Sequence, residues 1–263
     1  MELGLGGKVA LVTAASRGIG RGIAEELARE GAQLSICARG KDDLEAAAAE
    51  LRGHGVDVLA TPADVTIPED IDQVVDATAA HFGRVDILVN NAGDAWMGRS
   101  VDTSEEDWRY SMDVNLWSAV RFTRAVVPHL RAAGGGRIIN IGSVSSHTMI
   151  GGLADYQVAK AGLLAFAKTM AIDLADDGIL VNTVCPALIH TPLWDRLADS
   201  MVGVMGADRQ EVFDNLATGL LMVKRFGQVE EVTGLVAFLA SERASFITGA
   251  AFDIDGGFTK SMF

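Results

Sequence analysis

A tyrosine and a lysine four residues apart, with a serine upstream, are the side chains best suited to chemistry. Tyr156 and Lys160 lie in a helical stretch, where residues at this spacing share one face. A nearby ammonium favours tyrosinate, so Lys160 would lower the phenol pKa from its usual value of about 10. Ser143 follows a β-rich run, and its hydroxyl could hold a substrate oxygen. This trio predicts proton transfer at a carbonyl or alcohol oxygen, coupled to hydride transfer.

A glycine-rich turn near the start of the chain could bind a phosphate. The segment from Thr13 to Gly20, Thr-Ala-Ala-Ser-Arg-Gly-Ile-Gly, joins a β-rich run to a helical stretch. Such a turn lets backbone N–H groups approach a pyrophosphate at the positive end of a helix dipole. In the first βαβ unit it predicts a dinucleotide site, with a plain tight turn as the alternative.

Two arginines indicate which dinucleotide binds. NAD(H) would require an Asp or Glu about 20 residues after the glycines, to bind the ribose hydroxyls. The second β-rich run ends in Cys37-Ala38-Arg39-Gly40, so an arginine stands there instead. Arg17 adds a cation at a helix start, which is unfavourable unless an anion neutralises it. Together the arginines predict NADP(H), bound through its 2′-phosphate, in preference to NAD(H). Two solvated surface arginines are the alternative.

Seven short β-rich runs alternate with helical stretches and must position these groups. The runs are residues 9–13, 33–37, 57–60, 86–89, 137–141, 180–184 and 251–254. Several are apolar on both faces, as parallel strands covered by helices on each side are. The alternation predicts right-handed βαβ units in a Rossmann-like, doubly wound α/β sheet. No repeat or linker interrupts the chain, so we expect a single dinucleotide-binding catalytic domain over residues 1–263.

Several helix boundaries can be located from capping signals. Helices are expected to stop at Gly31, Gly53 and Gly83. The segment 66–69, Thr-Ile-Pro-Glu, has the pattern of a capping box with a proline in the first turn. Residues 104–107, Ser-Glu-Glu-Asp, predict the start of one long helix reaching towards residue 131.

Residues 191–225 form an insert without a strand before the last β-rich run. The insert carries Trp194, Met201 and Met205. Inserts of this length in compact domains often act as lids, so we expect a substrate-binding lid. Two amphipathic helices packed permanently on the domain are the alternative.

Composition and charge exclude several classes of protein. The chain has 263 residues, 49% of them apolar, which is enough for a large core and excludes disorder. A net charge of -13 argues against nucleic-acid binding and against docking onto anionic membranes. We find no signal peptide and no apolar run of the roughly 20 residues that a membrane helix needs. Cys37 and Cys185 are too few for a disulfide framework and predict a reducing, cytoplasmic compartment.

The histidines do not predict a metal site. His54, His81, His129 and His190 lack the paired spacing with cysteines or carboxylates that metal ligands show. His147 follows Ser143 closely and could contact substrate, although a solvated loop residue is the commoner case.

A set of motifs in fixed order covers nearly the whole chain. They are Thr13-Ala-x-x-x-Gly18-Ile-Gly20, Asp64-Val65, Asn90-Asn-Ala-Gly93, Asn115, Ser143, Tyr156-x-x-x-Lys160, Pro186 to Thr191, and Asp255-Gly-Gly257. In this order they resemble the short-chain dehydrogenase/reductase family, especially its 3-oxoacyl reductase-like members. The resemblance implies a seven-stranded parallel sheet and an NADP(H)-dependent oxidoreductase acting on CH–OH groups. It also implies a homotetramer, assembled through the long helices that contain Asn115 and Tyr156.

The resemblance assigns roles to individual residues. The catalytic residues would be Asn115, Ser143, Tyr156 and Lys160, with Asn115 keeping a helix bend and a water that extends the Lys160 proton relay. The cofactor-binding residues would be Thr13, Ser16, Arg17, Gly18, Ile19 and Gly20 in the turn, Arg39, Asp64 and Val65 at the adenine, Asn91, Ala92 and Gly93 along the cofactor, Tyr156 and Lys160 at the nicotinamide ribose, and Pro186, Ile189 and Thr191 near the carboxamide.

Three positions depart from the family pattern. Ala14 replaces the first glycine of the turn, so we expect altered cofactor affinity but not lost binding. Ala187 replaces the glycine usual after the proline, which restricts the backbone there. Asp155 could oppose tyrosinate at Tyr156, but neighbours on a helix point about 100° apart, so we expect little effect.

The sequence leaves the substrate open. Relatives that act on acyl carrier protein tend to place cations near the active-site mouth, at stretches matching residues 132–136 and 175–178. Asp176 and Asp177 would repel an acidic carrier, which favours a free, fairly apolar carbonyl or alcohol over a 3-oxoacyl thioester. A pocket of apolar side chains would suit that substrate, although the same residues could be ordinary packing. They are Trp96, Met97, Met149, Trp194 and Met205. A non-catalytic NADP(H)-sensing protein remains the alternative from another class.

Overall fold

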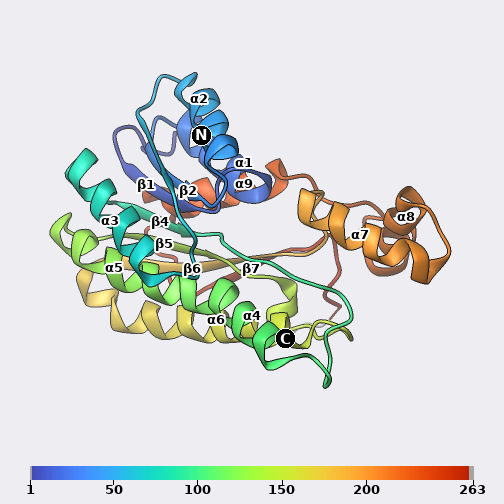
Figure 1. Ribbon diagram of the computed structural model, residues 1–263. Helices are drawn as coiled ribbons and strands as arrows, with labels where there is room; N and C mark the ends of the chain where they lie inside the picture. Colours follow the sequence, from blue (N-terminus) through green and yellow to red (C-terminus); the bar gives the residue numbers. More distant parts are fainter. Residues whose placement is uncertain (1, 261–263) are drawn as a thin grey trace.

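The computed structural model of the protein describes residues 2–260, in which one seven-stranded sheet organises the chain. All strand pairs are parallel and follow the order β3-β2-β1-β4-β5-β6-β7 (Figure 1). The strands are β1 (Val9–Thr13), β2 (Gln33–Ala38), β3 (Val58–Pro62), β4 (Ile87–Asn90), β5 (Gly136–Ile141), β6 (Ile179–Pro186) and β7 (Ala251–Ile254). The expected doubly wound α/β sheet is therefore confirmed, with strand ends shifted by a few residues at most.

Helices cover both faces of the sheet (Figure 1). One face packs against α1 (Gly18–Arg29), α2 (Lys41–Arg52) and α9 (Glu230–Ala240). The other packs against α3 (Pro68–Phe82), α5 (Ser118–Ala132) and α6 (Ala154–Asp173), and α4 (Glu105–Met112) lies beside α6. Among the described helices, none is both long enough and apolar enough to cross a membrane.

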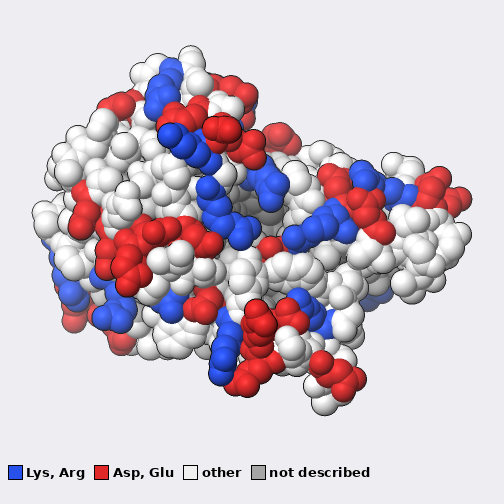
Figure 2. All heavy atoms as spheres, viewed as in Figure 1, with Lys and Arg blue, Asp and Glu red and all other residues white. Residues whose placement is uncertain are grey.

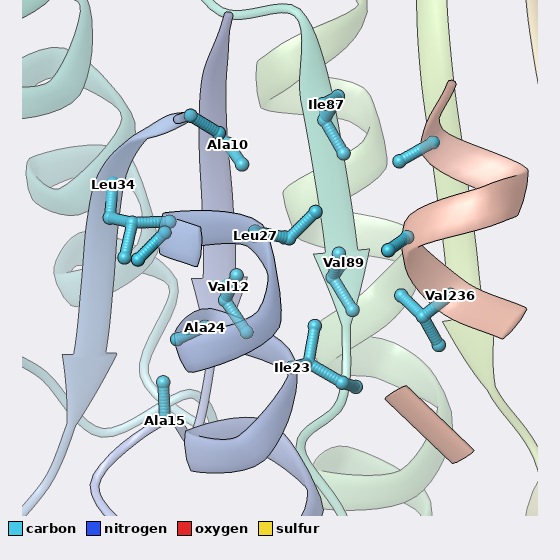
Figure 3. Close-up of a cluster of buried hydrophobic side chains, with 14 of the residues drawn as sticks. Ala10, Val12, Ala15, Ile23, Ala24, Leu27, Leu34, Ile87, Val89 and Val236 are labelled. Atoms are coloured by element: carbon cyan, nitrogen blue, oxygen red, sulfur yellow. The ribbon is translucent and has the colours of Figure 1, made fainter. Parts of the chain in front are cut away.

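Alternation of side chains along β1 creates the two cores. Val12 belongs to the cluster under α1 and α9, whereas its neighbour Leu11 belongs to the cluster under α3 and α5. Figure 3 shows Ile23 and Leu27 of α1 directed at Val89 and its neighbours on the central strands. Burying one such side chain stabilises the fold by about 1.5–3 kcal/mol. These contacts fix α1, and therefore the turn that precedes it, against the sheet.

The strand order reverses between β1 and β4. From β1 the chain winds outward to β2 and β3, and then returns to β4 on the other side of β1. In such sheets the carboxyl ends of the strands diverge at the reversal and leave a crevice for a ligand. The fold therefore brings the turn after β1 and the segments after β4 and β5 to one edge.

Four expected boundaries are confirmed and two expectations are wrong. Gly53 is the C-cap of α2, and Gly31 follows the end of α1 with a positive φ of 85°. Gly83 ends α3 in the left-handed conformation, and the Ser104 hydroxyl caps α4 by accepting the Asp107 N–H. Thr66 does not cap α3, because its hydroxyl donates to Asp64 Oδ1 at 2.8 Å and residue 67 precedes the helix. The expected long helix is interrupted by a π-helical turn, η1 (Asp113–Trp117), between α4 and α5.

The insert folds as two helices, α7 (Pro192–Met205) and α8 (Arg209–Leu220), which we call the α7–α8 lobe. No strand occurs between residues 191 and 225, as the sequence predicts. The lobe projects beyond the sheet (Figure 1, orange). Its small apolar core contains Ala198, Val212 and Phe213, and this core packs on Leu188 and Phe226 of the main body.

Candidate active site

A cavity of about 720 Å³ lies at the carboxyl edge of the sheet. One end is lined by the turn after β1, and the middle by Ser143, Tyr156 and Lys160. The α7–α8 lobe contributes to the other end. Figure 2 shows this region as a hollow between the lobe and the main body, with Lys and Arg side chains around its rim.

The turn after β1 is shaped by close packing against Asn91. The Asn91 Nδ2 donates to the carbonyl oxygens of Thr13 at 2.9 Å and Ala14 at 3.2 Å. A Cβ on Gly20 would lie 2.3 Å from that nitrogen, so glycine is required there. Ala14 adopts a left-handed conformation with φ 53°, which explains the family's preference for glycine at this position. The turn is therefore held against the segment after β4, and position 20 has no space for a side chain.

Thr13 lies beneath the cavity, outside its lining. Its side chain is buried, and its Oγ1 accepts the N–H groups of Asn91 at 2.9 Å and Ala92 at 3.1 Å. Thr13 thus joins the ends of β1 and β4. Its contact with the ligand, expected from the resemblance, would be indirect.

Arg17 and Arg39 both line the cavity near the turn and are exposed. Neither forms an ion pair within residues 2–260, and Arg39 Nη1 contacts the Tyr110 hydroxyl at 3.4 Å. Two unpaired guanidinium groups at one end of a cavity could hold an anion. Asp43, which sequence reasoning missed, also lines this end and brings an opposing charge. The sequence feature that could have identified it is its position in the first turn of α2, four residues after Arg39.

Most other expected cofactor residues line the same cavity. They are Ser16, Gly18, Ile19, Gly20, Asp64, Val65, Asn91, Ala92, Gly93, Pro186, Ile189 and Thr191. They come from segments far apart in the chain and follow the carboxyl ends of β1, β3, β4 and β6. The structure therefore brings together the residues named from the motifs, except Thr13 and Asn115, which lie outside the lining.

Tyr156 and Lys160 face the cavity from the first turns of α6. Lys160 is buried, and its Nζ donates to the Ile141 carbonyl oxygen at 2.9 Å. Burial lowers the pKa of Lys160 to about 8. Burial also raises the pKa of Tyr156 above its usual value, while the Ser143 hydroxyl opposes this and Cys185 and Asp94 add to it. Neither group by itself is therefore tuned to make tyrosinate in the ligand-free protein.

Ser143 is oriented by the turn that follows β5. Its Oγ accepts the Ser145 N–H at 3.1 Å, as the cap of the short helix η2 (Val144–Ser146). The bond uses a lone pair and leaves the hydroxyl proton free to donate to a ligand in the cavity. Ser143 therefore has one fixed acceptor bond and one available donor.

Asn115 is buried in the π-helical turn η1. Its Nδ2 donates to the carbonyl oxygens of Asp94 at 2.9 Å and Ser111 at 3.0 Å, and its Oδ1 accepts the Asp94 N–H at 3.1 Å. The turn is wide because the Ser118 N–H reaches back to the Asp113 carbonyl oxygen. Asn115 thus interrupts the helix and connects it to the segment after β4.

The remaining family departures are accommodated. Asp155 is buried, accepts the Tyr156 N–H at 2.9 Å, and lies 4.0 Å from Arg99. Asp94, and not Asp155, is the carboxylate that acts on the Tyr156 pKa. Ala187 avoids a positive φ angle, so its Cβ causes no backbone strain.

The expected apolar pocket is only partly correct. Met97 and Trp194 line the cavity, but Trp96, Met149 and Met205 do not, and the last two are exposed. Whether an apolar side chain lines the cavity depends on how its segment packs, so the sequence alone could not separate these residues. Near the α7–α8 lobe, the lining of the cavity also includes Leu197, Met201, Leu216, Leu220, Asp94 and Arg196.

His147 does not line the cavity. Its Nε2 lies 3.1 Å from Asp253 Oδ2. The possible metal-ligand atoms of His147, Cys185 and Asp253 all lie within 4.8 Å of one another. These three residues are far apart in the sequence, so their spacing does not predict this grouping. Burial raises the pKa of the Cys185 thiol to about 12, so the thiol is protonated at neutral pH.

The expectation that Asp176 and Asp177 would repel an acyl carrier protein at the active-site mouth is wrong, because these residues lie at the other edge of the sheet. Asp176 and Asp177 lie in η3 (Ala175–Asp177), just before the amino end of β6. Residues 133–136 and Gly178 line a second cavity of about 350 Å³ at that amino edge, opposite the carboxyl edge that holds Ser143 and Tyr156. Asp177 is also paired with Arg131, at 2.7 Å. These carboxylates therefore cannot repel a carrier at the active-site mouth.

Comparisons with known proteins agree with this geometry. The family model described as enoyl-(acyl carrier protein) reductase matches residues 13–259. The 3-oxoacyl acyl-carrier-protein reductase of Escherichia coli is 39% identical over 251 residues, covering 95% of this chain and 97% of that protein. Human dehydrogenase/reductase SDR family member 4 is 36% identical over 254 residues, covering 96% of this chain and 88% of that protein.

Among solved structures, one neighbour was determined with both ligands bound. L-sorbose reductase of Gluconobacter frateurii, complexed with NADPH and L-sorbose, superimposes with a TM-score of 0.96 and is 39% identical. The alignment covers 100% of both chains, including the α7–α8 lobe. With its sheet order, its cavity and these similarities taken together, the chain belongs to the short-chain dehydrogenase/reductase family of oxidoreductases.

Proposed function

We propose that the protein is an NADP(H)-dependent oxidoreductase that transfers hydride between the nicotinamide and a free small-molecule ketone or secondary alcohol. The main support for this proposal is that Ser143, Tyr156 and Lys160 meet in the middle of the cavity, between the turn after β1 and the α7–α8 lobe. A dinucleotide at one end and a substrate at the other would meet at these side chains.

The residues present fit an NADP(H) cofactor. The close approach at Gly20 presents backbone to a pyrophosphate, and the unpaired Arg17 and Arg39 suit a 2′-phosphate. Asp64 and Val65 would border the adenine, and Ile189 and Thr191 the carboxamide. When bound, NADP(H) supplies or accepts the hydride.

The protein's own groups handle the proton. Tyr156 would donate its phenol proton to the carbonyl oxygen during reduction, or accept the alcohol proton as tyrosinate during oxidation. The Ser143 hydroxyl would donate a hydrogen bond to the same substrate oxygen and fix its position. Lys160 would bind the nicotinamide ribose hydroxyls and stabilise tyrosinate. Asn115 would hold a water that connects Lys160 with bulk solvent, through the wide turn at η1.

Two observations bear on the substrate. The substrate end of the cavity is mainly apolar, with Trp194, Leu197 and Met201 from α7, and the pair Asp94 and Arg196 as its charged groups. The similarity to L-sorbose reductase over the full chain favours a free molecule, and keto sugars belong in the first trials. The similarity to the E. coli reductase keeps a 3-oxoacyl thioester as the second candidate.

Fluorescence titration with NADPH and NADH, followed by a carbonyl panel, tests the proposal. The panel contains keto sugars, diketones, cyclic ketones, and 3-oxoacyl thioesters on N-acetylcysteamine and on acyl carrier protein. We expect tighter NADPH binding and turnover of a free carbonyl. Turnover only with the carrier-bound thioester would establish the second candidate. Binding without turnover of any compound would favour an NADP(H)-sensing protein.

We also infer assembly into a homotetramer. Trp117 on η1 and Val158 and Ile172 on α6 are large apolar side chains with exposed fractions of 47%, 52% and 70%. They lie on the helices that the family resemblance names as interfaces, and their burial against other copies would remove this apolar surface from water. Light scattering after size exclusion measures the mass, and a monomer would contradict the inference.

A further inference from the structure

Arg196, near the start of α7, connects the α7–α8 lobe to the segment after β4. Its Nη2 donates to Asp94 Oδ1 and, at 3.0 Å, to the Ala95 carbonyl oxygen. Its guanidinium carbon lies 5.1 Å from the centroid of the Trp96 ring, within cation–π range. Within the described residues, these hydrogen bonds are the ones that join residues 192–220 to the chain outside the insert. One side chain therefore provides the polar link across the substrate end of the cavity.

The residue that Arg196 contacts also holds Asn115. The backbone N–H and carbonyl of Asp94 bond both ends of the Asn115 amide, at 3.1 Å and 2.9 Å. The preceding residue, Gly93, packs so closely that a Cβ there would lie 3.0 Å from Asn115 Oδ1 and 3.2 Å from Lys160 Nζ. A shift of Asp94 would therefore move the groups proposed to carry the proton away from Tyr156.

The other side of this segment is anchored to the main body. Arg99 lies 5.3 Å from the Trp96 ring centroid and forms ion pairs with Asp107 at 2.7 Å and with the buried Asp155 at 4.0 Å. Asp107 belongs to α4, and Asp155 precedes Tyr156 on α6. This side of the segment is therefore fixed to two helices of the main body, whereas the contact with Arg196 is formed with the lobe.

The contact between Arg196 and Asp94 has a second effect, because it compensates the negative charge of the Asp94 carboxylate. The Asp94 side chain is only 14% exposed, and its negative charge raises the pKa of Tyr156. Ser143 after β5 and Cys185 on β6 also act on the pKa of Tyr156, and Lys160 on its own helix lies 5.9 Å from the ring centroid. Arg196 is the cation paired with Asp94, so it compensates this charge when the lobe is closed.

We propose that Arg196 is a positioning residue that couples closure of the α7–α8 lobe over the substrate to proton transfer. It does so by holding Asp94 in place and by compensating the negative charge of its carboxylate. With the contact formed, Asn115 is held in place and Tyr156 is shielded from an uncompensated carboxylate. With the contact broken, substrate can enter or leave while proton transfer is disfavoured. This inference rests on the proposed function and concerns residues that touch neither the hydride nor the reacting oxygen.

Kinetics of matched variants test the coupling. Arg196→Met keeps the bulk of the side chain and removes its charge, and Arg196→Lys restores a cation. The control is Arg209→Met, which breaks the exposed ion pair with Asp199 within the lobe itself. We expect about a tenfold loss of kcat in Arg196→Met, partial recovery in Arg196→Lys, and less than a twofold change in the control. Equal losses in Arg196→Met and Arg209→Met would overturn the proposal.

The pH profile separates this role from a purely structural one. Arg196→Met leaves Asp94 uncompensated, so the apparent pKa of the catalytic phenol should rise. Asp94→Asn retains the backbone bonds to Asn115 but removes the charge, so the apparent pKa should fall. The double variant should return towards the wild-type value. A kcat loss in Arg196→Met without opposite shifts in the two single variants would mean that Arg196 only stabilises the lobe.

Hydrogen exchange tests the link without any substrate. In the NADPH-bound protein, Arg196→Met should speed amide exchange in residues 93–96 and around Asn115, compared with wild type and Arg209→Met. Unchanged exchange there would contradict the proposal. If no carbonyl in the panel is turned over, the proposed function fails, but this measurement still decides whether Arg196 holds Asp94 and Asn115.

Discussion

The Lys160 ammonium nitrogen lies 5.9 Å from the centre of the Tyr156 ring. Its hydrogen bond goes to the Ile141 carbonyl oxygen on β5, at 2.9 Å. Lys160 therefore acts on the phenol through space, and its position is fixed by the sheet. This arrangement allows one ammonium to serve both the phenol and a ligand in the cavity. It also makes the proton chemistry depend on the charge state of a buried lysine.

Removal of the Tyr156 hydroxyl should abolish turnover and leave cofactor binding largely intact. In the proposed function the phenol moves a proton, whereas the dinucleotide would be held mainly by the turn after β1. We expect Tyr156→Phe to lower kcat by at least about 100-fold, the scale of general acid–base catalysis. NADPH fluorescence titration should give a Kd within a few-fold of wild type. Turnover near the wild-type rate would contradict the assignment.

The pH dependence of alcohol oxidation should report the Tyr156–Lys160 pair. Oxidation requires tyrosinate, so its rate should rise as pH increases through the apparent pKa of the pair. Burial raises the pKa of Tyr156, and a charged ammonium held near a phenol favours tyrosinate. Lys160→Met should therefore shift this rise in rate to higher pH by about one unit or more. Lys168→Met, on the same helix but bonded to Gly249, is the control and should keep the wild-type profile.

Cofactor preference should depend on the two arginines at the phosphate end. Arg39→Asp combined with Arg17→Ser removes both cations and adds a carboxylate that can bind ribose hydroxyls. We expect the ratio of kcat/KM for NADPH over NADH to fall by about 100-fold or more, since two charged contacts are lost. Arg21→Ser, which breaks an ion pair with Glu50 on the surface, is the control. An unchanged ratio would mean that Arg17 and Arg39 are simply solvated.

The left-handed Ala14 should store backbone strain. Its φ of 53° costs an alanine about 1–2 kcal/mol, and glycine adopts this conformation freely. Glycine also makes the unfolded chain more flexible, so Ala14→Gly should stabilise the protein by about 0.5–1 kcal/mol net. Ala15→Gly, at a buried neighbour without a positive φ, should instead lower the Tm. Thermal unfolding of both variants checks this, and a lower Tm for Ala14→Gly would contradict it.

Stability should fall at alkaline pH because of the buried thiol of Cys37. Burial raises its folded-state pKa from 9.0 to about 12. Because the folded pKa is the higher one, the stabilisation is complete below pH 9 and is lost as pH rises towards 12. Between pH 9 and 11 the loss should be about 2 kcal/mol for this group. Urea unfolding of wild type and Cys37→Ala should show that the variant has a flatter pH dependence.

The strands and the pairing of Tyr156 with Lys160 on one helix face follow from local patterns. Apolar runs of five residues with glycine-ended helices between them are short-range signals, and they identified all seven strands to within a few residues. Tyr156 and Lys160 share a face because their spacing matches the helical repeat. The turn from Thr13 to Gly20 is only partly local. The motif itself is local, but the need for glycine at position 20 comes from the side chain of Asn91, after β4.

The tertiary structure alone decided which distant groups meet. Arg196 and Asp94 are 102 residues apart, and no pattern in either segment predicts their ion pair. Asp176 was misplaced at the active-site mouth because a stretch next to a catalytic helix can lie at either edge of the sheet. Thr66 matched a capping box but bonds Asp64 instead, since competing partners are visible only once the chain is folded. Spacing along the chain fixes which side chains share a local element, whereas the partners of charged side chains depend on how those elements pack.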